Sequence, residues 1–276
     1  GEEYRFLLFK KKRRTTKKTN RKRVENNMIT FDHVSKTYPN GVNDYADIVQ
    51  DEFRSRWLRG AWTDDTDQML CILDSLLDKG AVDPYDITSR FLKWFRSDGQ
   101  GVGRHTYNVL QMPQYEYHPH EAAELVWRFS RGKSAPNGAL MRTCILGIWD
   151  WQNAAAVRSN TECVCRLTHF DPRCVGSCVI ATHIIDGELL GTSTSEEAII
   201  RIGTEYAPEI EEFVQLGFQP DLGKLHLDDH GTKGYTLRTL AAGLWATISE
   251  RISVRHCRLS SRRAAIRIRT ELSPEH

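Results

Sequence analysis

The fold is decided by the stretch Trp62-Thr63-Asp64-Asp65-Thr66-Asp67 and by the run that follows it, Gln68-Met69-Leu70-Cys71-Ile72-Leu73-Asp74-Ser75-Leu76-Leu77. The apolar residues of the run recur at helical spacing, at positions 69, 72, 73, 76 and 77. Thr63 or Asp64 stands at a capping position, and Gly80 follows the last apolar residue. These signals predict a buried helix that opens on an acidic cluster.

The acidic cluster offers more oxygen atoms than a helix start requires. One such residue is enough for a cap, and a carboxylate there is favoured by the helix dipole. Asp64 and Asp65, flanked by Thr63 and Thr66, add further hard oxygen donors, which are the ligands that Mg²⁺ and Ca²⁺ prefer. Spacing alone leaves two interpretations open, a divalent metal site and a set of solvated carboxylates.

Most of the remaining chain carries the same helical signals. They predict helices that begin at Asp83-Pro84 and Pro119, helices over residues 139–149, 154–167, 171–185 and 235–249, and a helix from Ser195 to Leu216 that breaks at Pro208. In the helix from Pro119, we expect the inward residues to be Ala122, Leu125, Val126 and Phe129. No alternating strand pattern persists, so the sequence predicts an all-α fold.

Three further stretches join the acidic one. Residues 134–142 read Ser-Ala-Pro-Asn-Gly-Ala-Leu-Met-Arg, residues 168–173 read Thr-His-Phe-Asp-Pro-Arg, and residues 234–240 read Gly-Tyr-Thr-Leu-Arg-Thr-Leu. Together with residues 60–69 they resemble, in the same order, four motifs of the ADP-ribosylglycohydrolase family, whose members remove ADP-ribose from modified side chains. The resemblance covers about residues 40 to 248.

The resemblance implies an all-α, orthogonal helical bundle with a metal centre in a cleft. Family members hold two Mg²⁺ ions, and here the matching metal ligands are Thr63, Asp64 and Asp65. The two aspartates would act in catalysis through the metal. The residues that the resemblance places at the ADP-ribose are Gly101, Gly103, Asn137, Gly138, His169 and Tyr235.

Taken without the resemblance, each of these ligand candidates has an ordinary structural interpretation. The alternating glycines at 99, 101 and 103 lead into a helix and can close on an anion, but no strand precedes them as a dinucleotide fingerprint requires. Asn137-Gly138 is typical of a loop, a turn histidine such as His169 is usually hydrogen-bonded, and Tyr235 could be a core tyrosine. Arg142 is either an anchor beneath the ligand or a structural ion-pair partner.

The chain departs from the family pattern at both ends. The glycine-rich opening and the glutamate that precede the first metal motif are not recognisable, and the second metal motif, Gly-Asp-x-Asp-Thr, is missing after Trp245. We therefore expect a chain that is truncated or misjoined relative to a complete member, with at most one weak Mg²⁺ site. Full activity would need the absent carboxylates.

Charge is distributed unevenly along the sequence. The net charge is +2, yet residues 1–27 carry +8 and residues 251–276 carry +5, which leaves −11 on residues 28–250. This predicts a disordered basic leader (1–27), an incomplete helical domain (28–250) and an Arg/Ser-rich tail (251–276). The leader is either a nuclear-import or nucleic-acid-binding arm or a solvated segment, and without aromatic residues among its lysines any nucleic-acid contact would be non-specific.

Seven cysteines include Cys163, Cys165, Cys174 and Cys178, with His169 between the two pairs. Their spacing is poor for a structural zinc site, and buried reduced thiols are the favoured interpretation. No run of about eighteen apolar residues and no secretory signal is found in the sequence. We therefore expect no membrane contact and an intracellular protein, cytoplasmic or nuclear.

Two functions follow as expectations. The first is a Mg²⁺-dependent hydrolase that removes ADP-ribose from modified protein side chains or related ADP-ribose conjugates. The second is a non-catalytic ADP-ribose-binding or scaffold protein that uses its basic ends for nuclear or nucleic-acid contact. The sequence does not indicate which linkage a complete enzyme would cleave, nor the oligomeric state.

Overall fold

The computed structural model describes residues 63–97, 99–219, 221–227, 229 and 234–248. They belong to the second of two compact units of the chain, Trp62–His276, whereas the first unit, Gly1–Ala61, lies outside the described residues. The basic leader, the basic tail and the domain boundary at residue 28 also fall outside them and stay predictions.

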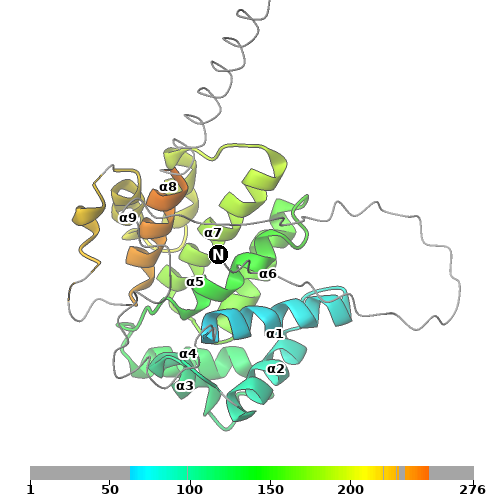
Figure 1. Cartoon of the computed structure of the whole chain (residues 1–276). Coiled ribbons are helices and arrows are strands. Elements are labelled where there is room, and N and C mark those ends of the chain that lie inside the picture. Colours follow the sequence, from blue (N-terminus) through cyan, green and yellow to red (C-terminus); the bar gives the residue numbers. More distant parts are fainter. Residues whose placement is uncertain (1–62, 98, 220, 228, 230–233, 249–276) are drawn as a thin grey trace, which may run out of the picture. The chain divides into compact units, whose positions relative to one another are not determined.

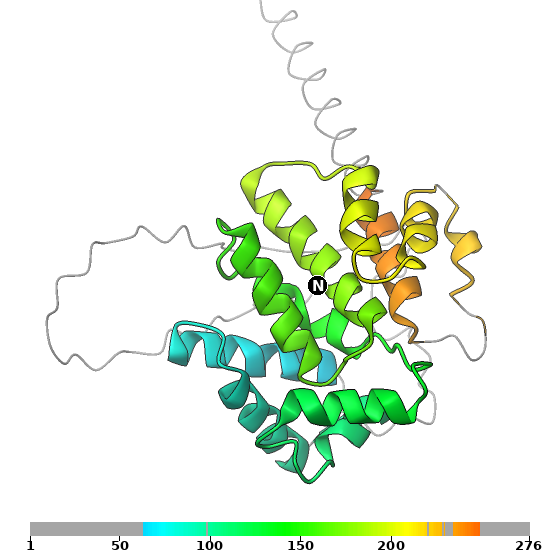
Figure 2. The ribbon, with the colours of Figure 1, turned by 180° about the vertical axis from the view of Figure 1, so that it is seen from behind.

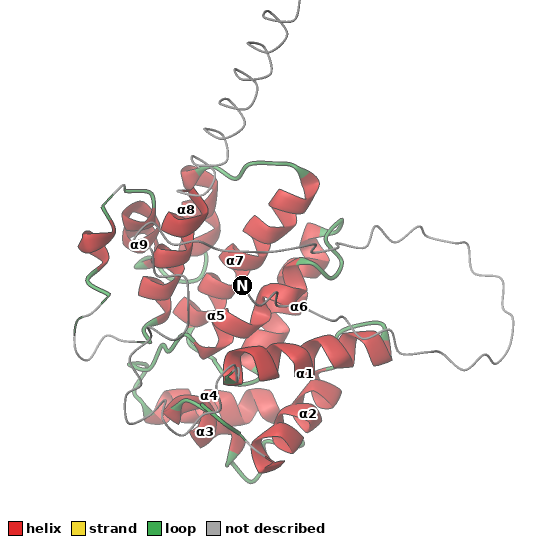
Figure 3. Cartoon of the chain, in the orientation of Figure 1, coloured by secondary structure: helices red, strands yellow, loops and turns green. Residues whose placement is uncertain are grey.

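Regular structure in the described part of the chain is helical, apart from one isolated bridge between Pro136 and Tyr235 (Figure 3). The elements are α1 (Asp64–Lys79), α2 (Pro84–Ser97), α3 (Arg104–Leu110), α4 (Pro119–Phe129), α5 (Gly138–Arg142), the 3-10 helix η3 (Thr143–Gly147), α6 (Ala154–Arg166), α7 (Pro172–Leu190), α8 (Glu196–Thr204), α9 (Ile210–Gly217), the 3-10 helix η4 (Leu222–Leu225) and a last helix over residues 236–248. The all-α prediction is confirmed.

Several helices begin and end where the sequence signals predict. Oδ1 of Asp83 accepts hydrogen bonds from the first turn of α2, and Asp171 and Ser195 cap α7 and α8 in the same way. Gly80 closes α1 in the left-handed conformation, at φ 75°. Thr63 occupies the cap position of α1, but its side chain accepts no capping hydrogen bond. Its hydroxyl is therefore not used for capping.

Helix α7 is the centre of the bundle and packs against α5, α6, α8, α9 and η3 (Figures 1 and 2). Ten of its residues are buried, on several sides of the helix. At Gly176 the backbone approaches α9 so closely that a Cβ atom would lie 2.5 Å from Cδ1 of Ile210. The glycine permits this contact, because any side chain would displace the isoleucine.

The buried apolar side chains of the described residues form three clusters. The first joins α1 to α4 through residues such as Ile72, Phe91 and Val109, at the lower end of the view in Figure 1. The second joins α7, α8, α9 and the last helix at the opposite end. The third lies between them and contains Ala135, Ala139, Cys165, Cys174, Val175, Cys178 and Val179. The motif at residues 134–142 is therefore fixed at the junction of the two ends.

Some predicted details are wrong. Leu125 and Phe129 are 39% and 78% exposed, because α4 turns the small residues Ala122 and Ala123 inward instead. Leu77, at the end of the apolar stripe of α1, is 60% exposed. A hydrophobic period fixes an apolar stripe only approximately, and neighbouring elements decide which part of it is covered.

The helix predicted over residues 139–149 is also wrong in its second half. Its α-helical part ends at Arg142 and continues as η3. Near its end η3 packs directly on α7, where a Cβ atom at Gly147 would lie 2.8 Å from the carbonyl oxygen of Thr182. Tertiary packing therefore overrides the local preference for an α-helix.

The six cysteines in the described ranges carry free thiols, and Cys165, Cys174 and Cys178 are buried, as expected for reduced thiols in a core. None of the described helices has both the length and the apolar character needed to cross a membrane.

Candidate functional site

The acidic start of α1 is partly buried rather than solvated. Burial, followed by the charge of Asp65, raises the pKa of Asp64 to about 6. Burial also raises the pKa of Asp65, whose Oδ1 is buried and has no hydrogen-bond partner among the described residues. Asp67 has a structural role, because it accepts a hydrogen bond of 3.0 Å from Nε1 of Trp94. Among the acidic side chains of this helix start, the buried oxygen without a partner is therefore that of Asp65, while the carboxylate of Asp64 receives hydrogen bonds from backbone groups of residues 64 and 65.

The glycine loop lies directly on Asp64 and Thr63 at the start of α1. Gly99 and Gly101 adopt positive φ angles of 58° and 84°, which favour glycine. A Cβ atom at Gly101 would lie 2.8 Å from Oδ1 of Asp64 and 3.4 Å from Cβ of Thr63. Gly101 is exposed, so the loop places an open peptide surface beside the carboxylate of Asp64.

A buried arginine connects the acidic helix to the histidine motif. Arg142 is fully buried and donates hydrogen bonds of 2.5 Å to Oε1 of Gln68 and to Oγ1 of Thr168. Its guanidinium also lies over the ring of Phe91, 4.8 Å from the centroid. Burial lowers the pKa of Arg142, while the charge of Asp64 acts in the opposite direction. Arg142 is therefore the internal cation that partly offsets the acidic pair.

His169 lies beneath the Asn137-Gly138 loop. It is only 1% exposed, and its Nδ1 lies 2.7 Å from Oγ1 of Thr168. A Cβ atom at Gly138 would lie 3.3 Å from Cε1 and from Nε2 of His169, and Nε2 has no hydrogen-bond partner in the described part of the chain. Burial lowers the pKa of His169 well below its ordinary value. His169 is thus a neutral side chain with one unused nitrogen under the loop.

The loop at Asn137 is tied to the start of the last helix. Backbone hydrogen bonds join Asn137 N to Gly234 O at 2.8 Å and Thr236 N to Ala135 O at 3.0 Å. The Asn137 amide donates to Oγ1 of Thr239 at 3.0 Å. These bonds set Tyr235 beside the loop, with its ring partly buried.

The predicted site residues therefore fall into contacting groups. Gly101 touches Asp64, Gly138 touches His169, and Asn137 bonds to Gly234, next to Tyr235. Arg142 and Thr168 connect the first two groups. Gly103 is exposed, and a Cβ atom there would have no neighbour within 4 Å.

Sequence reasoning missed two polar residues of this network. Gln68 lies one helical turn after Asp64 and receives the Arg142 hydrogen bond. His105 contacts the carbonyl oxygen of Thr168 at 2.9 Å and Ser134 Oγ at 3.2 Å, and its ring centroid is 4.8 Å from that of His169. Their positions in the sequence could have indicated both residues, because Gln68 shares a helix face with Asp64 and His105 follows the glycine loop.

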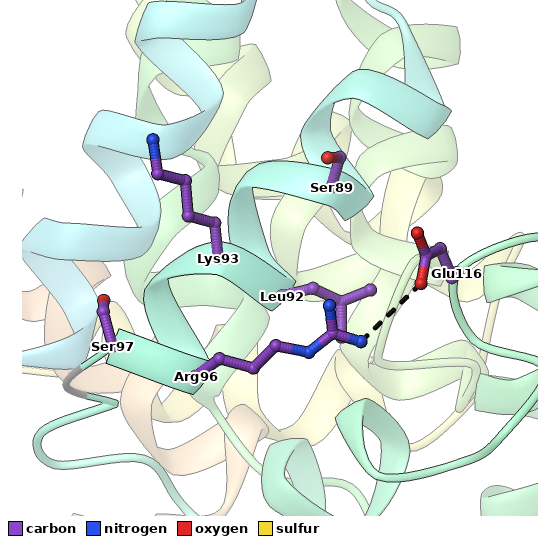
Figure 4. Close-up of a pocket in the computed structure, with 6 residues that line it drawn as sticks. All are labelled: Ser89, Leu92, Lys93, Arg96, Ser97 and Glu116. Carbon is purple, nitrogen blue, oxygen red and sulfur yellow. Dashed lines mark ion pairs between the residues drawn. The ribbon is translucent and has the colours of Figure 1, made fainter.

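Two cavities lined by described residues lie away from the candidate site. One, of about 340 Å³, lies on α2 and is lined by Ser89, Leu92, Lys93, Arg96, Ser97 and Glu116. There Arg96 reaches Glu116 at 3.6 Å while Lys93 points away from the pair (Figure 4). The other lies between α6, α7 and α8. Neither contains a predicted site residue, so the contacting groups above are defined by packing and hydrogen bonds alone.

A model of the ADP-ribosylglycohydrolase family matches residues 16–267. The chain belongs to the ADP-ribosylglycohydrolase family. The family assignment made from the four motifs is thereby confirmed.

Curated relatives of this ADP-ribosylglycohydrolase family member include Tri1, the ADP-ribosylarginine hydrolase of Serratia proteamaculans (strain 568). It is 25% identical over 195 residues, which cover 68% of this chain and 50% of Tri1. An uncharacterized protein of Archaeoglobus fulgidus is 26% identical over 145 residues, which cover 51% of this chain and 45% of that protein. The chain thus spans about half the length of the curated relatives it matches.

A solved structure described as an ADP-ribosylglycohydrolase-related protein complex is 27% identical to the chain, with a TM-score of 0.49. The similarity covers 68% of this chain and 60% of that one.

Proposed function

We propose that this ADP-ribosylglycohydrolase family member is a Mg²⁺-dependent hydrolase that removes ADP-ribose from modified protein side chains or related ADP-ribose conjugates. Family membership supports the reaction class. Similarity to Tri1, whose name specifies ADP-ribosylarginine, supports an ADP-ribosylated substrate. The observation that carries the proposal is the contact between the partly buried Asp64 and the glycine loop at Gly101.

The residues at the start of α1 fit a hard divalent cation. Two carboxylates with raised pKa values, one of them with a buried unpartnered oxygen, are what a site lacking its counter-charge should show. Thr63, Asp64 and Asp65 would hold Mg²⁺ together with water. Within the described ranges no three His, Cys, Asp or Glu side chains converge on one metal position, so this side of the site alone would bind weakly. When bound, the ion would supply Lewis-acid stabilisation to the ribose hydroxyls.

The chain's own residues would position the sugar nucleotide. The exposed peptide groups of Gly101 and Gly103 are suited to an anionic pyrophosphate, because a glycine backbone admits close approach. Asn137 and Gly138 would contact the ligand from a loop that Gly234 holds in place. The Tyr235 ring, beside Arg173 and Phe213, would stack on the base or the ribose. His169 would support Gly138 from below.

Hydrolysis then exchanges one bond for another. The oxygen of water bonds to C1 of the ribose, the bond from C1 to the acceptor side chain breaks, and the acceptor leaves with a proton. The pKa of about 6 belongs to Asp64 in the metal-free protein. A bound cation would lower it, so Asp64 is proposed as a ligand and not as the general base.

The test is release of ADP-ribose from an ADP-ribosylarginine peptide, measured with Mg²⁺ and after chelation. We expect release only with Mg²⁺, and a loss of at least about 10–100-fold in Asp64→Asn and in Asp65→Asn, as for other disturbed metal sites. Asp74→Asn, at an exposed position of the same helix, is the matched control. Equal release with and without Mg²⁺ would contradict the proposal.

A second candidate is a protein that binds ADP-ribose without turnover. It is favoured by the lack of a third metal-ligating acid near Asp64 and Asp65 in the described residues. Calorimetry separates the two, since heat of ADP-ribose binding without any release supports the second. The predicted nucleic-acid contact belongs to the basic ends, which lie outside the described residues.

A further inference from the structure

The cavity between α6, α7 and α8 shares no residue with the candidate site. Its volume is about 260 Å³, and its apolar wall consists of Ala154, Ala155, Val157, Val179 and Ile202. An apolar cavity of ~150 Å³ is enough to bind benzene. The space is therefore large enough for an aromatic ring with a short substituent.

One acidic side chain, Asp186, lines this space, together with Arg158, Thr182 and His183. Asp186 of α7 is only 3% exposed, and its Oδ1 is buried without a hydrogen-bond partner among the described residues. Burial raises the pKa of Asp186. A buried carboxylate without a partner is costly, so such groups are normally paired with a cation or a hydrogen-bond donor.

The other polar groups of the cavity do not fill this role. Arg158 donates to Glu162 at 3.3 Å and to Glu205 at 2.6 Å, so its charge is already paired. The Thr182 hydroxyl donates to carbonyl oxygens of its own helix, those of residues 178 and 179. His183, one turn before Asp186, lowers the pKa of that carboxyl, but its influence is smaller than that of burial.

We propose that this cavity binds a small organic cation, an ammonium or amidinium group on an apolar body, with Asp186 as the counter-ion. The cationic group pairs with the carboxylate of Asp186, and the apolar body lies against Ala155, Val157 and Ile202. A carboxylate with one oxygen that has neither solvent exposure nor a donor among the described residues favours a cation over a neutral compound of the same shape.

Benzylamine is a suitable probe because it carries one ammonium group on an aromatic ring. Its binding to the full chain is measured by calorimetry at about pH 8, where an ordinary imidazole is neutral, and is compared with benzyl alcohol and benzoate. We expect saturable binding of benzylamine, at least about tenfold weaker binding of the alcohol, and none of benzoate, from the loss of one charge-assisted hydrogen bond.

Variants assign the effect to the cavity. Asp186→Asn should weaken benzylamine binding about tenfold or more and remove the preference over benzyl alcohol. Ala155→Phe, at an exposed position of the cavity wall, keeps the carboxylate and narrows the opening, so it should weaken the binding of both compounds. Glu188→Gln, at an exposed position of the same helix, should bind as the unmodified chain does. Cooperative melting of each variant confirms that it is folded.

Three results would overturn the proposal. They are absence of benzylamine binding to the folded chain, equal affinity for amine and alcohol, and unchanged binding in Ala155→Phe. The last readout keeps the test decisive if Asp186→Asn does not fold.

Discussion

Gly101 lies so close to Asp64 that a Cβ atom on the glycine would be 2.8 Å from Oδ1 of the aspartate. The loop and the acidic helix start are therefore one unit, and a change in either is transmitted to the other. This contact joins two segments that are nearly forty residues apart in the sequence.

Gly101→Ala should disturb this unit. The alanine would adopt a φ of 84° and press on the Asp64 carboxylate, and we expect a loss of about 1–2 kcal/mol in the free energy of unfolding together with weaker Mg²⁺ binding. Gly103→Ala is the control, because its φ is −70° and its Cβ would meet no neighbour within 4 Å. Urea unfolding measures the stability of both variants. Equal unfolding midpoints for Gly101→Ala and Gly103→Ala would contradict the contact.

Arg142→Met should be strongly destabilising. The substitution keeps much of the volume but leaves Gln68 and Thr168 without their buried donor, and removes the cation nearest the acidic pair. We expect a loss of about 3 kcal/mol. Arg128→Met is the control, since that arginine side chain is 68% exposed and surface changes usually stay within about 0.5 kcal/mol. A similar small effect at position 142 would show that the arginine is not a structural link.

Asp64 should make the metal-free protein less stable as the pH rises. Its pKa is raised from 3.8 to about 6 on folding, so between these values the folded state binds more protons than the unfolded state. Stability from this group is present below about pH 4 and is lost as the pH approaches 6. Asp64→Asn should flatten that decline and, at pH 7, stabilise the metal-free protein by about 1 kcal/mol after solvent screening.

Addition of Mg²⁺ should reverse this difference in stability, so that Asp64→Asn is no longer more stable than the unmodified chain. The ion should raise the melting temperature of the unmodified chain and of Asp74→Asn, but not that of Asp64→Asn. A Mg²⁺ response that survives in Asp64→Asn would place the ion elsewhere.

His169 should make the protein less stable as the pH falls below about 6.5. Its pKa is lowered well below the ordinary value by burial, and by the charges of His105 and Arg142. The unfolded chain takes up this proton near pH 6.5 and the folded chain does not, so stability falls as the pH drops below that value. His169→Gln should reduce the slope of unfolding free energy against pH between about 6.5 and 5, whereas the exposed His118→Gln serves as the control. An unchanged slope in His169→Gln would mean that the imidazole is not excluded from water.

The fold was predictable because its helices begin and end with strong local signals. Asp83-Pro84, Asp171-Pro172 and Ser195 start helices where expected, and Gly80 ends one. The faces of α4 were not predictable from the hydrophobic period. Leu125 and Phe129 fit the period as well as Ala122 and Ala123 do, and the choice between them depends on packing partners from distant parts of the chain.

The candidate site was predictable only where a motif was recognisable. The motifs supplied Asp64, Asp65 and His169, but not the way they are connected. The connection passes through Arg142, Gln68 and Thr168, and a buried hydrogen-bond network of this kind has no periodic signature in a sequence.

The hydrogen bonds between the Asn137 loop and residues 234–239 also set an order of events during synthesis. The ribosome releases the loop about a hundred residues before its tether, at a rate that makes this an interval of seconds. Until Gly234 and Thr239 emerge, the nascent chain lacks the hydrogen bonds that join Asn137 to the last helix. The surface around Asn137 is therefore completed late in synthesis, after residues 234–239 have left the ribosome.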